Sequence, residues 1–394
     1  MKPQGMTSGY AFAGNPVIYR ETLDTSHSDE QIRGGSYRVR LGEETIYEGK
    51  FSLPVSINLS ELLSGEADEI VKPSLLVYQW VFPVTRTGRK TTLSMTVEYD
   101  NGADWESLPV EILRGRIPSA EYFASSLGSG DIFTARFLNP EANFFMTGRT
   151  TELLLEIPET EIYPLCFIMP GGKGITVEAG GKTYESGILP RGIYWLNLAW
   201  IRKDIYTQGL DRQLVSEFLV GHSDSDCRVR VVITRVDPAV SRVRLRYRNY
   251  FDIPELMAFS GTLSANPVLD DDQDREYLQY ARYTDDYELG KNNSTVRLAL
   301  SLDTGEVAAR DIHRLIELLA SRSVHLESPV DGSWLPVTVS AGDDFSFPLR
   351  PETPLSFNLS LTLAKEDLSL LSLLKPESAE PWRIFSVEHN DRFI

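Results

Sequence analysis

Residues 169–174 have the composition of a loop that could hold a phosphate group. They read Met169-Pro170-Gly171-Gly172-Lys173-Gly174. A Walker loop needs GxxxxGK followed by Ser or Thr, because the hydroxyl must reach the metal ion. Phe167 stands at the first glycine position and Gly174 follows the lysine. This segment is therefore interpreted as a hairpin turn.

The acidic run 270–275 has residue types that bind calcium. An EF-hand loop needs glycine at its sixth position and a bidentate glutamate at its twelfth. Counted from Asp270, these positions hold Arg275 and Ala281. The run departs from the motif and predicts a solvated acidic loop, with a calcium site of another type as the alternative.

The spacing of the histidines and cysteines does not favour a catalytic or metal-binding site. His222-Ser223-Asp224 contains triad residue types, but adjacent residues cannot form the line from nucleophile to base to orienting carboxylate. The two cysteines, Cys166 and Cys227, form no CxxC pair and are expected to be buried or half-buried. We therefore predict no catalytic residue, metal or cofactor. With 56 acidic residues, a carboxylate pair assembled by the fold remains an alternative.

Arginines alternate with other residues along one predicted strand. These arginines are Arg242, Arg244, Arg246 and Arg248, with Arg228 and Arg230 on a preceding strand. Alternation places one set on one face of a strand and the residues between them on the other. We predict a docking face for an acidic partner, such as a second copy. The acidic stretch beginning at Asp270, Asp271 and Asp272 is a candidate counterpart, and ion pairing to local carboxylates is the alternative.

Tyrosines gather between residues 277 and 287, with Tyr280 and Tyr283 among them. Tyrosine covers a large area at little entropic cost, so this stretch is a second candidate interface, and packing within a hairpin is its alternative. Trp195 and Trp200 could line a sugar site, although the apolar run around Trp195 is more typical of a core.

Net charge narrows the classes of partner. The chain has 394 residues, with 39 basic and 56 acidic side chains and a formal net charge of −17. This charge repels nucleic acid and anionic membranes from most of the surface. The sequence contains no apolar run long enough to cross a membrane, and its first residues lack the apolar core of a secretory signal.

Short alternating strands separated by turns dominate the chain. Tyr37–Leu41 and Thr45–Tyr47 flank a turn, and Leu75–Phe82 and Thr91–Tyr99 are further predicted strands. We predict a mainly β, multi-domain, β-sandwich-like architecture. The expected domains are residues 1–116, residues 117–236 in the middle and residues 237–394.

One packed helix is predicted in the C-terminal domain, over residues 305–321. Apolar residues recur on one face at helical spacing, including Ile312 and Leu315. Asp303 and Glu306 have the spacing of a capping box at its start.

Two groups of residues support a resemblance to a known class of protein. The first is Phe12-Ala13-Gly14-Asn15-Pro16-Val17, followed by a strand pair that ends in Tyr47-Glu48-Gly49. The second runs from Leu245 to Glu255, followed by Phe259-Ser260-Gly261 and, after the predicted helix, by Leu318–Leu326 and Leu335–Val339. This order of elements resembles uncharacterised tail-type proteins of phages and prophages of gut bacteria, of the Bacteroides-like kind. The middle block, residues 117–236, matches poorly.

The resemblance implies a non-enzymatic structural component of a phage virion, in the tail or baseplate. Such a protein would be made in the host cytoplasm, assemble with other virion proteins and copies of itself, and need no cofactor. The alternatives are an adhesin or receptor-binding protein that binds a glycan or a cell surface, and a hydrolase on a β scaffold.

Overall fold

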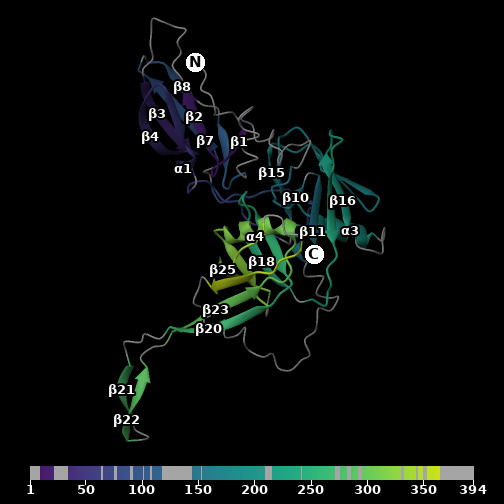
Figure 1. The fold of residues 1–394 in the computed structure, drawn as a ribbon. Coiled ribbons are helices and arrows are strands. Elements are labelled where there is room, and N and C mark those ends of the chain that lie inside the picture. Colours follow the sequence, from purple (N-terminus) through teal and green to yellow (C-terminus); the bar gives the residue numbers. More distant parts are fainter. Residues whose placement is uncertain are drawn as a thin grey trace. The chain divides into compact units, whose positions relative to one another are not determined.

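The computed structural model describes residues 9–363 except 22–33, 64, 75–77, 89–91, 101, 107–108, 118–143, 152, 209–214, 241, 271–275, 282–284, 292–294, 330–331, 343–344 and 349–352. The fold is mainly β, with several sheets, which confirms the predicted class (Figure 1). The chain divides into two compact units between Val236 and Asp237. Residues Arg248–Glu255 also belong to the first unit, and the second unit takes Asp237–Tyr247 and the described residues from Leu256 to Leu363.

The N-terminal sheet of the first unit is built around two long antiparallel strands. Its strands in order are β1 (Gly9–Phe12), β9 (Val110–Leu113), β7 (Thr92–Tyr99), β3 (Gly34–Leu41) and β4 (Glu44–Ser52), with β8 (Asp104–Glu106) paired to β7. Val39 and Leu41 are buried while Arg38 and Arg40 are exposed, as alternation requires. The predicted strands 37–41 and 45–47 are confirmed, and so is the described part of the predicted strand 91–99, from Thr92.

A second layer covers the apolar face of this sheet. It consists of the two-stranded antiparallel sheet of β2 (Ile18–Glu21) with β5 (Val55–Asn58) and the short helix α1 (Ser60–Leu63). Tyr19 and Leu59 belong to the same buried cluster as Val39 and Met95. The hydrophobic core of this part therefore lies between the two layers.

The rest of the first unit contains two further sheets. One runs β10 (Thr150–Thr151), β11 (Leu154–Pro158), β17 (Val229–Thr234), β16 (Glu217–His222), β13 (Ile175–Ala179) and β14 (Lys182–Glu185). The other runs β12 (Leu165–Met169), β15 (Gly192–Leu196) and β6 (Val81–Pro83). A 3-10 turn, η2 (Glu159–Glu161), follows β11.

Three local predictions in this unit need correction. Residues 169–174 do form a turn, with positive φ at Gly171 and Gly172, but β12 and β13 on either side pair in different sheets, so they are no hairpin. Of the predicted strand 75–82, only the part from Val81 is a strand among the described residues. A helix, α3 (Leu198–Thr207), was not predicted, although the side chain of Asn197 caps its first turn.

The predicted division at residue 116 runs through a shared core. Strand β6 lies before this division, yet it pairs with β15 of the middle block. One buried cluster combines Phe12, Phe82 and Leu113 with Cys166 and Trp195. Residues 1–116 and 117–236 therefore lie in one compact unit, and whether each folds alone stays a prediction.

The second unit is a seven-stranded sheet with one helix packed on it. The strands in order are β19 (Pro254–Phe259), β18 (Val243–Arg248), β24 (Val324–Glu327), β25 (Trp334–Ala341), β26 (Asn358–Leu363), β23 (Thr295–Asp303) and β20 (Leu263–Asp270). Helix α4 (Ile312–Leu319) buries Leu315 and Leu318 in the core of this sheet. Strands β21 (Glu276–Ala281) and β22 (Asp286–Lys291) form a separate two-stranded sheet.

The predicted helix of the C-terminal domain is present but shorter than expected. A 3-10 turn, η4 (Ala309–Asp311), leads into α4, and Val307 forms an isolated bridge with Leu355 instead of a helical turn. The Asp303 carboxylate accepts hydrogen bonds from Gly305 N and Ser356 Oγ, so it ends β23 and caps no helix. In the described part of the chain, no helix combines the length and hydrophobicity needed to span a membrane.

Candidate functional site

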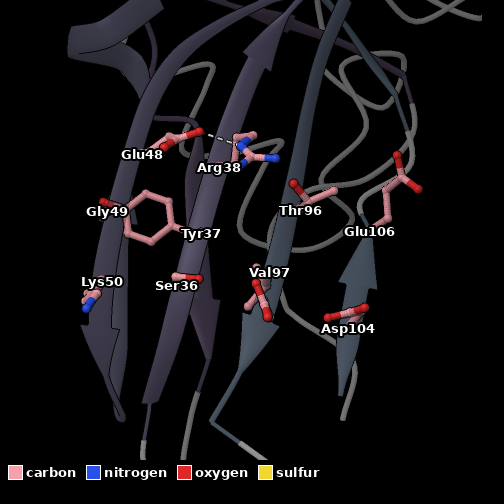
Figure 2. A pocket seen from close by; sticks show the side chains of 11 residues that line it. Ser36, Tyr37, Arg38, Glu48, Gly49, Lys50, Thr96, Val97, Asp104 and Glu106 are labelled. Atoms are coloured by element: carbon pink, nitrogen blue, oxygen red, sulfur yellow. Dashed lines mark hydrogen bonds and ion pairs between the residues drawn. The ribbon is translucent and has the colours of Figure 1, made fainter. Parts of the chain in front are cut away.

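A hollow on the outer side of the N-terminal sheet gathers polar side chains from four strands. It has a volume of about 730 Å³ and is open to solvent. Alternate residues of β4, β3, β7 and β8 supply these side chains (Figure 2). We call the following residues the polar sheet face: Ser36, Arg38, Glu48, Lys50, Thr96, Glu98, Asp104 and Glu106.

The two ends of the polar sheet face have opposite charge. On the β3–β4 side, Arg38 Nε lies 2.5 Å from Glu48 Oε1, and Lys50 is the cross-strand neighbour of Ser36. On the β7–β8 side, Glu98 stands opposite Asp104. Like charges directly opposite in a sheet are unfavourable. A cationic group of a partner would therefore stabilise the acidic end. The face as a whole is suited to binding a charged protein surface.

Sequence reasoning missed this face. The alternation of Ser36, Arg38 and Arg40 was visible, and so was that of Thr96 and Glu98. The sequence could not show that β3 pairs with β7, because 50 or more residues separate the paired positions. Only that pairing brings the two sets of side chains onto one surface.

A second cluster, the buried junction, joins three segments that are far apart in the sequence: Phe12–Asn15, Gly115–Ile117 and Asn249–Ile253. Asn15 is buried, and its amide group donates from Nδ2 to Ile117 O at 3.0 Å and accepts from Ile117 N at 2.7 Å. This pair of bonds satisfies a backbone donor and acceptor that would otherwise be buried without partners.

The third segment of the buried junction is held by Asn249 in the same way. Its Oδ1 accepts hydrogen bonds from Phe251 N and Ile253 N, both at 3.0 Å. The ring of Phe251 packs on Phe12, with centroids 5.7 Å apart. Gly115 allows this approach, since a Cβ there would lie 2.5 Å from the carbonyl carbon of Phe251.

A buried carboxylate pair lies beside the junction. Arg149 Nη1 is 2.7 Å from Glu161 Oε2, and Arg149 Nε is 3.5 Å from Glu255 Oε2. The exposed fractions of the three side chains are 4%, 4% and 9%. A glycosidase needs two carboxyl groups that flank a substrate cleft. These two instead share a buried guanidinium, which is the arrangement of a structural ion cluster.

The predicted arginine strand has two distinct faces, as expected. Leu245 and Tyr247 are fully buried in the core of the second unit. Arg244 and Arg246 both lie over the ring of Trp334, at 5.9 and 4.6 Å from its centroid. The arginine face is covered, however, because Arg246 is only 7% exposed.

Local partners hold the arginines of this strand. Arg244 Nη1 donates to both carboxylate oxygens of Glu327, at 2.9 and 3.0 Å. Arg248 belongs to the first unit, where it pairs with Glu69 and Asp252. Arg242 is half-buried just before β18. Arg244 and Arg248 therefore form ion pairs with nearby carboxylates, which was the alternative interpretation of this face. Contact of the face with a second copy of the chain stays a prediction.

The other predicted interface residues are scattered or not described. Arg230 is exposed and pairs with Glu217, and Arg228 donates to carbonyl groups of its own loop, including that of Ser225. Asp270 ends β20 opposite Thr295, and Tyr280 stands opposite Tyr287 where β21 pairs with β22. For Asp270 and Tyr280 the structure describes the backbone alone. Asp271, Asp272 and Tyr283 lie outside the described residues.

The triad-like segment contains a buried histidine. His222 ends β16 with no exposed surface, and its ring packs edge-on against Phe144 at 4.7 Å. Burial, assisted by the nearby positive charges of Lys173 and Arg228, lowers the pKa of His222 to about 4. The described residues contain no group of three His, Cys, Asp or Glu side chains placed to hold a metal ion.

The cysteines and tryptophans are mostly packed. Cys166 is buried and Cys227 half-buried, as expected, and both are free thiols. Trp195 lies in a buried cluster. Trp200 is half-buried, and its ring meets Tyr184 edge-on at 6.3 Å.

Comparisons with known proteins add little to this geometry. No family model and no curated protein matches the chain. A solved structure of the fibronectin(III)-like modules of Clostridium thermocellum CbhA matches 59% of this chain and 94% of its own, with 10% sequence identity and a TM-score of 0.17. A score this low carries no argument about the fold or function of this chain.

Proposed function

We propose that this protein is a non-enzymatic structural component of a phage virion, in the tail or baseplate. The observation that supports this role best is the buried junction. Two of the sequence segments that carry the phage resemblance, Phe12–Val17 and Leu245–Glu255, supply two of its three parts. Their side chains form hydrogen bonds to backbone groups and pack against one another, which supports a structural role and not a catalytic one.

The polar sheet face is the proposed docking surface for a neighbouring virion protein. It lies on regular strands, and side chains on strands are held more firmly than those on loops. Its charged residues are exposed, and the β7–β8 end is wholly acidic whereas the β3–β4 end has a net positive charge, so a partner of complementary pattern would bind in one orientation.

A glycan-binding or cell-surface-binding role is the second candidate. Trp80, Tyr184 and Trp200 form an aromatic group in the first unit, and Tyr184 Oη donates to Asp204 Oδ2 at 2.7 Å. Aromatic rings beside polar groups suit a sugar ring. A glycan screen with the purified chain tests this role, and Trp200→Ala should abolish any binding that depends on the group.

Purified particles test the structural role directly. Particles from the induced native host are banded on a density gradient and their proteins are quantified by mass spectrometry. A fixed stoichiometry of this chain relative to other particle proteins is the expected result. Its absence from the particles, with abundant free protein in the lysate, would overturn the proposal.

Charge reversal tests the docking surface. Arg38→Glu with Lys50→Glu should lower the free energy of unfolding by only about 1 kcal/mol, because Arg38, Lys50 and Glu48 are exposed, and should prevent incorporation into particles. Lys203→Glu with Arg235→Glu is the matched control, since it changes exposed residues of the same unit by the same charge. Normal incorporation of the first variant would rule out the polar sheet face as the docking surface.

A further inference from the structure

The loop between β16 and β17, residues 223–228, is held against the turn at residues 169–174. Ser223 N donates to Gly174 O at 3.0 Å, and Gly174 N donates to Ser223 Oγ at 3.1 Å. Lys173 Nζ lies 3.0 Å from Asp224 Oδ2, and the exposed fractions of the two side chains are 34% and 54%. Two hydrogen bonds and a partly exposed ion pair therefore join the β16–β17 loop to this turn.

The β16–β17 loop is also held together internally. Arg228 Nη1 donates to the carbonyl oxygens of His222 at 3.3 Å and Cys227 at 3.1 Å, and to that of Ser225. Ser225 N donates to His222 O at 3.2 Å, and Cys227 N donates to Ser225 Oγ at 3.1 Å. Because these bonds lie within the loop, it can move away from the turn as one body, hinged where β16 ends and β17 begins.

His222 stands at the base of the β16–β17 loop. It ends β16 opposite Ile175 of β13, and its fully buried ring lies against the ring of Phe144. Among the described residues, neither ring nitrogen of His222 has a hydrogen-bond partner. A buried polar group without a partner is destabilising, so the surrounding packing must hold the ring in place.

The charged groups around His222 oppose a proton on its ring. Burial, the largest cause, and the charges of Lys173 and Arg228 lower the pKa of His222 to about 4, whereas Asp224 acts in the opposite direction. Asp224 is already paired with Lys173, and Arg228 Nε lies 3.8 Å from Glu178 Oε1 of β13. Both nearby carboxylates therefore have a cationic partner, and a protonated ring is better accommodated in water.

The β16–β17 loop should therefore open as the pH falls. The pKa of His222 is about 4 with the loop closed and ordinarily 6.5, so the closed form is fully favoured above pH 6.5 and loses this advantage as the pH falls toward 4. At pH 4.5 the difference shifts the equilibrium toward the open form by about 80-fold. The hydrogen bond from Lys173 lowers the pKa of Asp224, so their ion pair persists at this pH and is not the trigger.

Opening of the loop disturbs less of the protein than unfolding of the sheet does. Ser223, Asp224 and Asp226 are exposed, whereas Val220 and Val229 on either side of the loop are fully buried and stand opposite each other. Segments with few buried contacts and solvent-exposed hydrogen bonds open at a lower free energy than core strands. The hinge therefore lies at the edge of the core.

We propose that the β16–β17 loop is an acid-sensitive switch, in which protonation of the buried His222 releases the loop from the 169–174 turn while β13, β16 and β17 stay folded. The open form exposes the imidazole ring and the backbone groups of Gly174 that the loop covers when it is closed. This switch is a property of the single chain and does not depend on the virion role proposed above.

Hydrogen exchange of the full chain at pH 7 and pH 4.5, followed by mass spectrometry, tests the switch. Rates are expressed as protection factors, relative to an unstructured peptide at the same pH. The informative peptides contain Gly174 and Ser223, whose amide groups bond the turn to the loop. Their protection should fall at least tenfold at pH 4.5 and should then lie at least tenfold below that of β17.

The variant His222→Leu should keep the protection of these peptides nearly constant between the two pH values, because its side chain gains no proton. His222→Gln takes its place if the leucine variant does not fold. His313→Gln is the matched control, since it removes an exposed histidine and should retain the fall in protection.

Three results would overturn the switch. One is an unchanged protection of the Gly174 and Ser223 peptides at pH 4.5 in the natural chain. Another is an equal fall in the variant that lacks His222. The third is equal protection of the loop and β17 at pH 4.5, which would show that the whole sheet unfolds. Particle composition judges the virion role separately, and neither experiment decides the other.

Discussion

At the scale of single residues, the first unit depends on two buried asparagines, Asn15 and Asn249, whose amide groups are hydrogen-bonded to backbone groups. Asn15 is the clearest case, because its two amide atoms bind the N–H and the C=O of Ile117. A buried polar group left without a partner costs about 1–3 kcal/mol. Substitutions that keep the shape but remove a donor should therefore be costly here.

Asn15→Asp should lower the free energy of unfolding by about 2 kcal/mol or more, since it removes the donor to Ile117 O and buries a carboxyl group. Urea unfolding at pH 7 measures this change. Asn266→Asp is the matched control, because Asn266 also precedes a proline and valine but is exposed. A loss of equal size in both variants would contradict the role assigned to Asn15.

His222 should make the protein less stable in acid. Its pKa is about 4 in the folded chain and ordinarily 6.5, so the unfolded chain binds the proton more tightly. The stability that neutral His222 contributes is complete above pH 6.5 and is lost as pH falls toward 4. The loss should reach ~3 kcal/mol at the lower end.

Urea midpoints at pH 7 and pH 4.5 measure this loss. His222→Leu should flatten the difference between the two midpoints, whereas replacement of the exposed His313 by Gln should not. An unchanged pH dependence in His222→Leu would contradict the assignment.

At the scale of elements, close approach of separate segments decides where glycine is needed. Gly115 has φ of 108°, and a Cβ would meet the backbone of residues 250–252. Gly102 also has positive φ, 79°, but a Cβ there would have open space. The two positions separate the cost of backbone conformation from the cost of a clash.

Gly102→Ala should cost about 1–2 kcal/mol, the usual cost of left-handed backbone for a residue with a Cβ. Gly115→Ala should cost clearly more, because segments 115–117 and 249–253 must also move apart. Thermal unfolding of both variants measures the difference. Equal shifts in the midpoint of thermal unfolding would show that segments 115–117 and 249–253 can move apart at little cost.

The arginine strand of the second unit is part of that unit's stability. Reversing Arg244 to Glu would place two carboxylates together, since Arg244 already pairs with Glu327 and both side chains are less than 20% exposed. Burial raises the pKa of Glu327 even beside this arginine.

Arg244→Glu should cost ~3 kcal/mol, as expected when one partner of a buried ion pair is reversed. Arg230→Glu should cost less than about 1 kcal/mol, because Arg230 and Glu217 are both at least half exposed. Urea unfolding compares them. A variant in which Arg244 and Arg246 are both replaced by Glu could fail to assemble simply because it fails to fold. Substitutions in the polar sheet face therefore give a cleaner test of docking.

At the scale of the whole molecule, the first unit has a core that crosses the division predicted at residue 116. The cluster that includes Phe12, Leu113, Ile168, Trp195 and Phe251 joins segments from the predicted N-terminal, middle and C-terminal domains. Elements that share a core tend to unfold as one cooperative unit.

Destabilising the junction should loosen the two large sheets of the first unit together. In Gly115→Ala, hydrogen exchange should accelerate in β7 of the N-terminal sheet and in β16 of the middle sheet by similar factors. Hydrogen exchange with mass spectrometry measures both. Acceleration confined to β7 would indicate that residues 1–116 form a domain of their own.

The sequence by itself determined the class of fold and many of its strands. Alternation is a local pattern, so it placed β3, β7 and β18 without knowledge of their partners. It also separated the two faces of β18, with Leu245 and Tyr247 inside. The helix over 312–319 was visible for the same reason, although its start was not, because Asp303 turned out to bind Gly305 and Ser356.

Only the tertiary structure decided which faces are open and which segments meet. The arginines of β18 have the pattern of an exposed face, but Glu327 of β24 and Trp334 of β25 cover it. The polar sheet face exists because β3 pairs with β7, and the buried junction because residues 12–15, 115–117 and 249–253 converge. Such contacts join residues 50 to more than 200 positions apart, and no local pattern encodes that distance.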